Sequence, residues 1–300
     1  MKTLVTGALQ ASAAELGELE KLGLEIVFQQ DERDETESPE QFEAVICNGL
    51  FLYNDIGKFE NLKYIQLTSA GTDRVPTDYV QEHGIVLKNA AGVYAAPMAE
   101  WTLMRLLELY KNADKLFANK SWLKDRTWRE LGGKTACIVG FGAYGREVAK
   151  RLKAFDVKVC VVNRSIKESP FADEFFTMDK LDEVLKKADI VIPAIALTEE
   201  TKKLFNAERF AKMKDGAVFL NATRGGILDE IALIDALENK LAGAALDVFE
   251  TEPLPDDSRL WQIEKLLISP HNSFVGENNH ARLMKTVFDN ASAYLETIGE

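Results

Sequence analysis

Three segments of the sequence each end an apolar run with a side chain that can bind or transfer charge. LNATRGGILDE places Arg224, AALDVFETEPLP places Glu252, and ISPHNS places His271. An arginine can hold a carboxylate through two parallel hydrogen bonds. A histidinium can give a proton to a ketone oxygen, and a nearby glutamate favours the charged ring and orients it. Each residue alone could be structural, but together they suit redox chemistry on a 2-oxo acid.

A glycine-rich turn precedes these segments. IVGFGAYGREVAKRL contains Gly140, Gly142 and Gly145 after the strand-like run TACIV and before a helical pattern. In that setting the first glycine permits a tight turn, the second lets the backbone approach a pyrophosphate, and the third lets helix and strand pack closely. The first N–H groups of the helix then favour anionic phosphates. We expect a nicotinamide dinucleotide here, held also by backbone groups of Ala143 and Tyr144, although a purely structural glycine turn is the alternative.

The strand after the glycine turn ends in polar residues where an acidic one is usual. VKVCVVN is followed by Arg164, Ser165 and, further on, Lys167, and Asn163 lies 18 residues beyond Gly145. An acid at about this distance binds the ribose of NAD and repels a 2′-phosphate. Asn163 removes that repulsion, and Arg164 and Ser165 offer donors to a phosphomonoester. We therefore expect NADP as cofactor with NAD possible; alternatively, Arg164 is a solvated surface residue and NAD is used.

Short apolar runs alternate with amphipathic ones in two series, which is typical of parallel α/β sheets. Pro97 suits the start of a helix over 97–117 whose wide apolar stripe needs cover. A last helix over about 278–298 is not followed by a strand. We predict an α/β fold of two Rossmann-like or flavodoxin-like domains with parallel sheets. The substrate-binding domain takes residues 1–94 and 275–300, and the dinucleotide-binding domain takes residues 95–274. In the first domain we expect strands at 4–7, 24–29, 44–49, 62–71 and 84–89, with a helix at 11–23.

Composition narrows the functional classes. The 300 residues suggest about two domains, and a net charge of −12 disfavours nucleic-acid binding. No apolar run approaches the roughly 20 residues that cross a bilayer, and Gly7 and Gln10 argue against a signal peptide. Cys47, Cys137 and Cys160 lie in apolar runs and suit buried thiols of a reducing compartment rather than a zinc site or disulfides. We expect a cytoplasmic protein without metal, membrane or nucleic-acid partners.

Over nearly its whole length the chain resembles the D-isomer-specific 2-hydroxyacid dehydrogenase family. The segments ELGGKTACIVGFGAYG, FLNATRGGILDEIALIDAL, LAGAALDVFETEPLP and SPHNS carry the resemblance. It implies NAD(P)-dependent reduction of a 2-oxo acid to a D-2-hydroxy acid in a cleft between two domains. It also implies a homodimer formed through the nucleotide domain, which would cover the helix at 97–117.

The resemblance also implies roles for individual residues. Arg224 would bind the substrate carboxylate and carbonyl, and Glu252 and His271 would form the proton relay. Asp247 would contact the nicotinamide carboxamide. The remaining expected contacts are Thr223 with the cofactor and the backbone around Ala70 and Gly71 with the substrate.

The chain departs from the family pattern at three places. Ala143-Tyr144 stands where Arg-Ile is common, Ala194-Ile195-Ala196 replaces His-x-Pro, and Asn272-Ser273 replaces small apolar residues. Two rival functions stay open. A formate dehydrogenase relative would carry Gln in place of Glu252, and a dinucleotide-sensing corepressor could retain the whole set. The sequence does not identify the 2-oxo acid: Leu50 and Phe51 fit a branched or aromatic substrate or simple packing within the domain.

Overall fold

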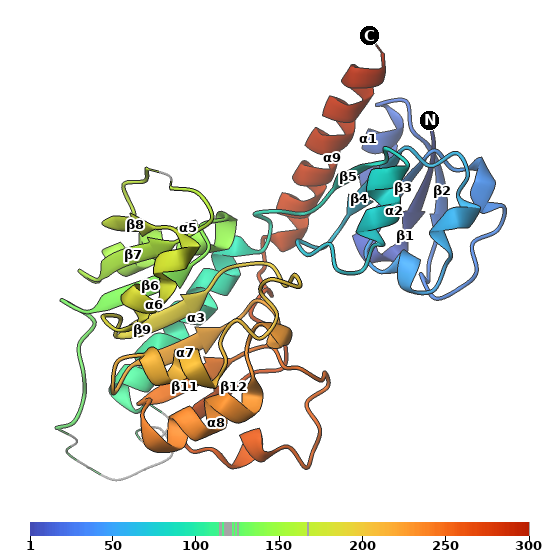
Figure 1. The fold of residues 1–300 in the computed structure, drawn as a ribbon. Coiled ribbons are helices and arrows are strands. Elements are labelled where there is room, and N and C mark those ends of the chain that lie inside the picture. Colours follow the sequence, from blue (N-terminus) through green and yellow to red (C-terminus); the bar gives the residue numbers. More distant parts are fainter. Residues whose placement is uncertain (114–115, 117–121, 123, 125, 167, 300) are drawn as a thin grey trace. The chain divides into compact units, whose positions relative to one another are not determined.

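The computed structural model describes residues 1–113, 116, 122, 124, 126–166 and 168–299. The chain divides into two compact units (Figure 1). Unit 1 consists of Met1–Tyr94 and Gly276–Glu300, and unit 2 of Ala95–Val275. Each unit contains one parallel sheet, so the predicted α/β fold is confirmed. No helix in the described part of the chain combines the length and apolar character needed to span a membrane.

Unit 1 contains a five-stranded sheet in the order β2-β1-β3-β4-β5, which is the flavodoxin-like order. Every pairing is parallel, and the inner strands β3 and β4 are buried along their whole length. The strands are β1 (Lys2–Thr6), β2 (Glu25–Gln29), β3 (Ala44–Cys47), β4 (Tyr64–Leu67) and β5 (Val86–Lys88). The helices are α1 (Ala13–Glu20), α2 (Thr77–Glu82) and α9 (Asn279–Ile298), with 3-10 turns η1 (Gly7–Leu9), η2 (Pro39–Gln41), η3 (Leu50–Leu52) and η4 (Ile56–Lys58).

Helix α9 belongs to the core of unit 1 although it lies at the far end of the chain. Leu283, Val287 and Ala291 recur every four residues and are buried in one cluster with Val5 and Ile46. This spacing places them on one face of the helix. In Figure 1 α9 is the red helix beside the blue strands. The first 94 residues therefore lack part of their own core.

We expect residues 1–94 expressed alone to be unfolded. Loss of α9 uncovers the apolar face it buries, and burial of Leu283 and Val287 contributes about 1.5–3 kcal/mol each, a large part of a typical domain stability of about 5–15 kcal/mol. Circular dichroism and urea unfolding of the fragment check this, with the fragment plus a 276–300 peptide as the matched control. A 1–94 fragment that unfolds cooperatively by itself would contradict the prediction.

Glu15 of the capping box at the start of α1 also contacts His280 of α9. The Glu15 carboxylate accepts hydrogen bonds from Ser12 N–H at 2.8 Å and the Ser12 hydroxyl at 2.7 Å, and it also contacts His280 Nε2 at 2.8 Å. The Ser12 bonds, with a smaller contribution from His280, lower the pKa of Glu15 from 4.5 to about 2. The carboxylate form is thus favoured by folding.

This lowered pKa predicts a pH dependence of stability. A group whose pKa falls on folding contributes stability above its unfolded value, and that contribution is lost as pH falls through the folded value. Between pH 4.5 and about 2 the wild-type urea midpoint should fall, and Glu15→Gln should flatten that part of the curve. Urea midpoints across this window check the prediction, with the exposed Glu20→Gln as control. Equal slopes in wild type and Glu15→Gln would contradict it.

Unit 2 contains a seven-stranded parallel sheet in the order β12-β11-β10-β9-β6-β7-β8. The strand order reverses between β6 and β9, which is the switch point of a dinucleotide-binding sheet. The strands are β6 (Thr135–Val139), β7 (Lys158–Val162), β8 (Glu174–Phe176), β9 (Ile190–Pro193), β10 (Val218–Asn221), β11 (Gly243–Leu246) and β12 (Leu266–Ile268). The helical elements are α3 (Ala95–Lys111), α5 (Ala143–Lys153), η5 (Met178–Lys180), α6 (Leu181–Leu185), α7 (Ala207–Lys212), η6 (Gly225–Ile227), α8 (Glu230–Asn239) and η7 (Arg259–Gln262).

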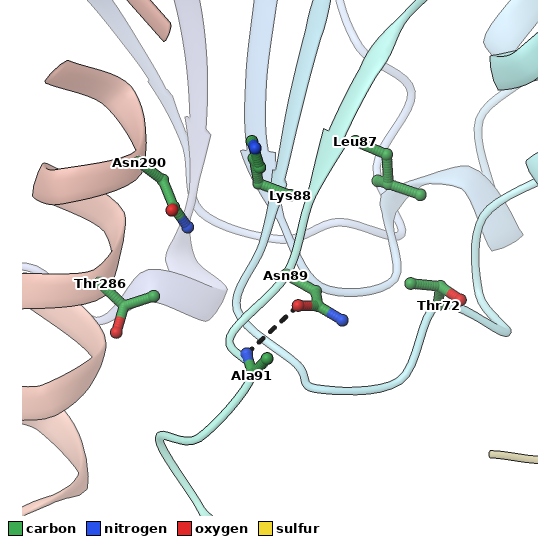
Figure 2. Close-up of a pocket in the computed structure, with 7 residues that line it drawn as sticks. All are labelled: Thr72, Leu87, Lys88, Asn89, Ala91, Thr286 and Asn290. Carbon is green, nitrogen blue, oxygen red and sulfur yellow. Dashed lines mark hydrogen bonds between the residues drawn. The ribbon is translucent and has the colours of Figure 1, made fainter. Parts of the chain in front are cut away.

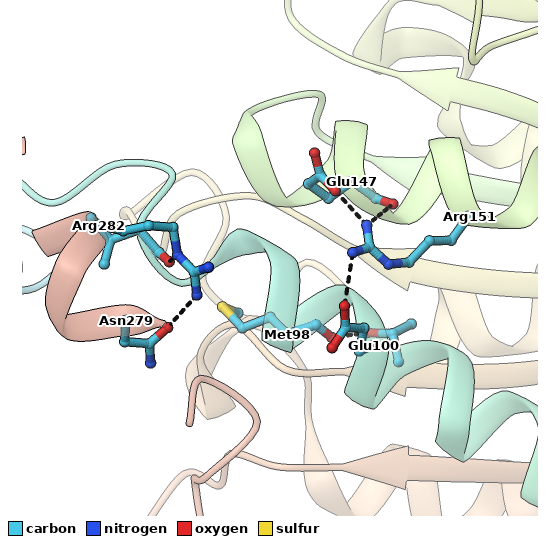
Figure 3. A network of polar contacts seen from close by, with 8 residues as sticks. Met98, Glu100, Glu147, Arg151, Asn279 and Arg282 are labelled. Carbon is cyan, nitrogen blue, oxygen red and sulfur yellow. Dashed lines mark hydrogen bonds and ion pairs between the residues drawn. The ribbon is translucent and has the colours of Figure 1, made fainter. Parts of the chain in front are cut away.

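Helix α3 packs within its own unit. Trp101, Leu106 and Tyr110 are buried in the same cluster as Val148 of α5 and the strands of the sheet. Arg151 of α5 donates to Glu100 Oε1 at 3.0 Å and also pairs with Glu147 (Figure 3). Much of the apolar stripe of α3, which we expected a second copy of the chain to cover, is therefore buried by the same chain. The helix begins two residues before the predicted start; residues 114, 115 and 117 of the predicted range lie outside the described residues.

The three cysteines are buried thiols, as expected. Cys47 and Cys137 have no exposed surface and Cys160 is 5% exposed. Burial raises the pKa of all three thiols. None of them supplies a reactive thiolate to the site described next.

Candidate active site

Most candidate residues of unit 2 follow the carboxyl ends of its strands. The glycine loop follows β6, Asn163 follows β7, Arg224 follows β10 and His271 follows β12. Because these strands are parallel, their carboxyl ends share one edge of the sheet, where ligands of this fold class bind. The order of the strands thus gathers residues that are far apart in sequence.

The glycine loop has the geometry that its spacing predicts. Gly140 has φ +100°, and a Cβ there would lie 2.3 Å from Ala194 O. A Cβ at Gly145 would lie 2.5 Å from Gly140 O, whereas nothing lies within 4 Å of a Cβ at Gly142. Gly140 and Gly145 thus allow strand, loop and helix to pack closely. The open space at Gly142 suits the backbone approach of a pyrophosphate, and the first N–H groups of α5 lack partners within the helix.

The Tyr144 side chain reaches α3. Its ring is 9% exposed, and its hydroxyl lies 2.7 Å from Thr102 Oγ1 of α3. Burial raises the pKa of the Tyr144 phenol, so it stays neutral. Thr102 in turn donates to Met98 O at 2.8 Å. The departure from the family pattern at this position therefore anchors α5 to α3 and leaves the loop backbone unobstructed by the ring.

The end of β7 forms a small turn. Asn163 Nδ2 donates to Ser165 O at 2.9 Å, and Asn163 N–H donates to Phe176 O of β8. Arg164 and Ser165 are exposed at this turn. The hydrogen bond from the Thr198 hydroxyl lowers the pKa of Glu200, and the Arg164 charge adds a smaller contribution. Lys167 lies outside the described residues.

Arg224 is held by the turn that follows β10. Asn221 donates from Nδ2 to Arg224 O at 2.9 Å and accepts from Thr223 N–H and its hydroxyl. A Cβ at Gly225 would lie 1.9 Å from the carbonyl carbon of Phe249, so only glycine fits there. This close approach joins the Arg224 turn to the segment that leads to Glu252. Arg224 itself is half-buried and donates to Thr223 O at 2.9 Å.

The structure brings Glu252 and His271 together. His271 Nδ1 lies 2.6 Å from Glu252 Oε2, and both side chains are about one-third exposed, at 33% and 34%. The other oxygen of Glu252 accepts from Phe249 N–H at 3.0 Å, which fixes the carboxylate. Since a carboxylate accepts, Nδ1 carries the proton of this bond and the Nε2 atom remains for a ligand. The pair has the geometry of an oriented acid–base group.

Asp247 is fully buried, and its main-chain oxygen accepts from His271 N–H. Its carboxylate accepts from the Ser269 hydroxyl at 2.6 Å, Asn272 N–H at 3.0 Å and Ser273 N–H at 2.8 Å. Sequence reasoning did not find this support. The expected contact of Asp247 with a nicotinamide carboxamide stays a prediction.

In unit 1 the segment after β4 offers free backbone donors. Its carbonyls are taken: Tyr94 O–H donates to Thr68 O, Ala90 N–H to Ser69 O, Asn89 Nδ2 to Ala70 O, and Ser69 O–H to Gly71 O. Within the described residues, the N–H groups of Ala70 and Gly71 have no acceptor. Paired free N–H groups of this kind suit a carboxylate.

Asn89 was not identified from the sequence, yet it braces this segment. Besides its bond to Ala70, its Oδ1 accepts from Ala91 N–H at 3.2 Å (Figure 2). Asn89 and Thr72 also line a cavity of about 310 Å³ next to α9.

Leu50 and Phe51, which the sequence offered either for the substrate or for packing, lie in unit 1. Leu50 is completely buried, and Phe51 packs edge-on against Phe59. Leu50 therefore belongs to the core of unit 1, and the partly buried Phe51 packs against the same cluster.

Comparisons with known proteins find relatives of this chain. Residues 101–273 match the family model for the D-isomer specific 2-hydroxyacid dehydrogenase, NAD binding domain. The chain is 33% identical over 268 residues to a hydroxypyruvate reductase of Thermotoga maritima, covering 84% of this chain and 85% of that protein. It is 36% identical over 255 residues to a D-3-phosphoglycerate dehydrogenase of Bacillus subtilis, covering 82% of this chain but only 48% of that protein.

A solved structure shows the same fold over nearly the whole length. It is a D-isomer specific 2-hydroxyacid dehydrogenase from Xanthobacter autotrophicus in complex with NADPH and MES. The two share 26% sequence identity and a TM-score of 0.79, covering 98% of this chain and 95% of that one. The family model alone covers more than half of the chain. With these similarities and the glycine loop in place, the chain belongs to the D-isomer specific 2-hydroxyacid dehydrogenase family.

Proposed function

We propose that the protein reduces a 2-oxo acid to a D-2-hydroxy acid, with the nicotinamide dinucleotide supplying hydride. The observation that carries this proposal is the 2.6 Å contact between His271 Nδ1 and Glu252 Oε2. Glu252 holds the ring so that Nε2 can give a proton to the substrate carbonyl oxygen, and its charge stabilises the imidazolium. In the reverse direction neutral His271 takes the hydroxyl proton. Glutamate at position 252 does not match the Gln of the formate dehydrogenase alternative.

Substrate binding in this proposal rests on positive charge and backbone donors. Arg224 binds the carboxylate by a forked contact and polarises the carbonyl oxygen. The free N–H groups of Ala70 and Gly71 are the proposed substrate contacts of unit 1. The same reasoning from the family favours a homodimer, which light scattering can test.

The residues present fit a dinucleotide. Gly140 and Gly145 allow close packing, Gly142 leaves room for the pyrophosphate, and the first turn of α5 supplies N–H donors through Ala143 and Tyr144. Thr223, in the turn that follows β10, is proposed to contact the same dinucleotide. Among the described residues there is no group of three or more His, Cys, Asp or Glu side chains that could hold a metal.

Turnover of 2-oxo acids tests the proposal directly. The purified protein is mixed with NADH or NADPH and with glyoxylate, hydroxypyruvate, pyruvate or a branched 2-oxo acid, and absorbance at the nicotinamide band is followed. Consumption with at least one acid and formation of the D-hydroxy product are expected. Cofactor binding without turnover of any acid would favour the sensor alternative, and oxidation of formate with NAD⁺ would favour a formate dehydrogenase.

We propose NADP as the preferred cofactor, because Asn163, Arg164 and Ser165 form a turn without an acid at the ribose position, and Arg164 and Ser165 are exposed. Arg164→Ala should lower kcat/KM for NADPH roughly 10- to 100-fold, since it removes charge-assisted hydrogen bonds to the 2′-phosphate, and it should affect NADH much less. Asn163→Asp should shift preference toward NADH.

Steady-state kinetics with both cofactors check the preference. The exposed Arg259→Ala, on η7, serves as the matched control for loss of a surface arginine. Equal losses with NADH and NADPH in Arg164→Ala would count against the assignment.

A further inference from the structure

The backbone of His271 has a conformation that other residues must enforce. Its φ is +48°, in the left-handed region that residues other than glycine seldom adopt. Such conformations persist only where the surroundings determine them, and they gather at functional sites. His271 N–H donates to Asp247 O at 2.8 Å and also approaches Ser269 O at 3.1 Å. The segment Ser269–Ser273 is called the His271 turn below.

Asp247 accepts hydrogen bonds from three backbone N–H groups of this turn. Its main-chain oxygen accepts from His271 N–H, and its carboxylate accepts from Asn272 and Ser273 N–H. Three successive backbone donors thus end on one residue. Because Asp247 is 0% exposed, water does not compete for these bonds. The position of the His271 ring then depends on where the Asp247 carboxylate is held.

A buried tryptophan of α3 extends this support. Trp101 Nε1–H donates to Ser269 Oγ at 2.9 Å, and the Ser269 hydroxyl donates its proton to Asp247 Oδ1 at 2.6 Å. A hydroxyl has one proton and two lone pairs, so accepting from Trp101 commits its proton to Asp247. Trp101 and Ser269 are 7% and 5% exposed. The relay runs from α3 through Ser269 and Asp247 to the His271 turn.

We infer that Trp101 is a positioning residue for the proposed proton donor, acting through the Ser269 hydroxyl and the Asp247 carboxylate on the His271 turn. This inference rests on the proposed role of His271. Trp101 precedes Thr102, which holds the Tyr144 hydroxyl of the cofactor loop. Adjacent residues of α3 therefore hold the His271 turn and the glycine loop separately. If Trp101 had a packing role alone, its replacement by phenylalanine would leave the proton transfer from His271 unchanged.

The test is a set of variants in wild-type and His271→Ala backgrounds. Trp101→Phe keeps the ring and removes the N–H, Ser269→Ala removes the hydroxyl, and Ser269→Thr restores it. Trp261→Phe is the matched control, because its indole N–H donates to Pro255 O at the surface. Measured are kcat for 2-oxo acid reduction, the solvent deuterium isotope effect, the cofactor Kd and the melting temperature.

We expect Ser269→Ala, which loses a hydrogen bond to the Asp247 carboxylate, to lower kcat about tenfold. Trp101→Phe loses a hydrogen bond to a neutral hydroxyl and should lower kcat about fivefold. The solvent isotope effect should rise, the cofactor Kd should stay unchanged, and Ser269→Thr should retain near-normal kcat. In the His271→Ala background Trp101→Phe should cause no further loss, because its effect passes through His271.

Two results would overturn the inference alone: an unchanged kcat in both Trp101→Phe and Ser269→Ala, or the same fractional loss with and without His271. If Trp101→Phe does not fold, Ser269→Ala and Ser269→Thr decide the matter by the same readouts. If His271→Ala itself reduces 2-oxo acids normally, the proposed proton relay fails and the inference fails with it. The single variant His271→Ala therefore separates a failure of the proposed proton relay from a failure of the inference about Trp101 alone.

Discussion

His271→Ala should lower kcat for reduction of a 2-oxo acid by about 10²–10⁴-fold, the usual contribution of a positioned general acid. The substrate carbonyl oxygen gains negative charge as hydride arrives at carbon, and without His271 only water supplies the proton. The cofactor Kd should remain unchanged, because the glycine loop follows a different strand. The exposed His83→Ala is the matched control, since His83 lies in unit 1 at the end of α2. Near-normal reduction by His271→Ala would exclude this proton donor.

The pH profile separates the role of Glu252 from that of His271. Reduction requires imidazolium, so its rate should fall as pH rises and the ring loses its proton. Oxidation of the D-2-hydroxy acid requires neutral imidazole and should rise over the same range. Glu252→Gln keeps the shape of the side chain and removes the charge that stabilises imidazolium, so the reductive limb should move to lower pH. An unshifted profile in Glu252→Gln would assign that residue to ring orientation only.

The buried strands and the glycine loop could be predicted from the sequence, because each depends on residues that are close together in the chain. Apolar runs between glycine and polar residues located the strands that lie under helices, for example β3 and β4. The edge strand β8 was missed because it has only three residues, none of them buried. The glycine spacing was informative because each glycine meets a specific backbone constraint within the same loop.

The convergence of Glu252 and His271 could be expected from topology alone. Both follow strands of one parallel sheet, so their side chains share an edge. The supporting bonds could not be expected, because they join residues that no periodicity relates. Trp101 and Ser269 are 168 positions apart, and the indole N–H has no pattern that marks its acceptor. Likewise, Tyr144 differed from the family pattern, but only packing against α3 shows where its ring lies.

Arg224→Ala should lower kcat/KM for the 2-oxo acid roughly 10²–10³-fold. The guanidinium is proposed to make paired charge-assisted hydrogen bonds to the carboxylate, each worth about 1.5–3 kcal/mol. Its backbone should stay in place, because the Asn221 hydrogen bonds and the close packing of Gly225 against Phe249 hold the turn without the Arg224 side chain. The effect should therefore be chemical rather than conformational.

Arg224→Lys distinguishes charge from geometry at the same position. Lysine keeps the positive charge but cannot form the planar fork, so kcat/KM should recover only part of the loss. Loss in both KM and kcat would indicate that Arg224 also stabilises the carbonyl oxygen as it becomes negative, since interactions stronger in the transition state appear in kcat. Loss in KM alone would limit Arg224 to binding the carboxylate. The surface variant Arg259→Lys should leave both constants unchanged, and an unaltered kcat/KM in Arg224→Ala would remove this residue from the substrate site.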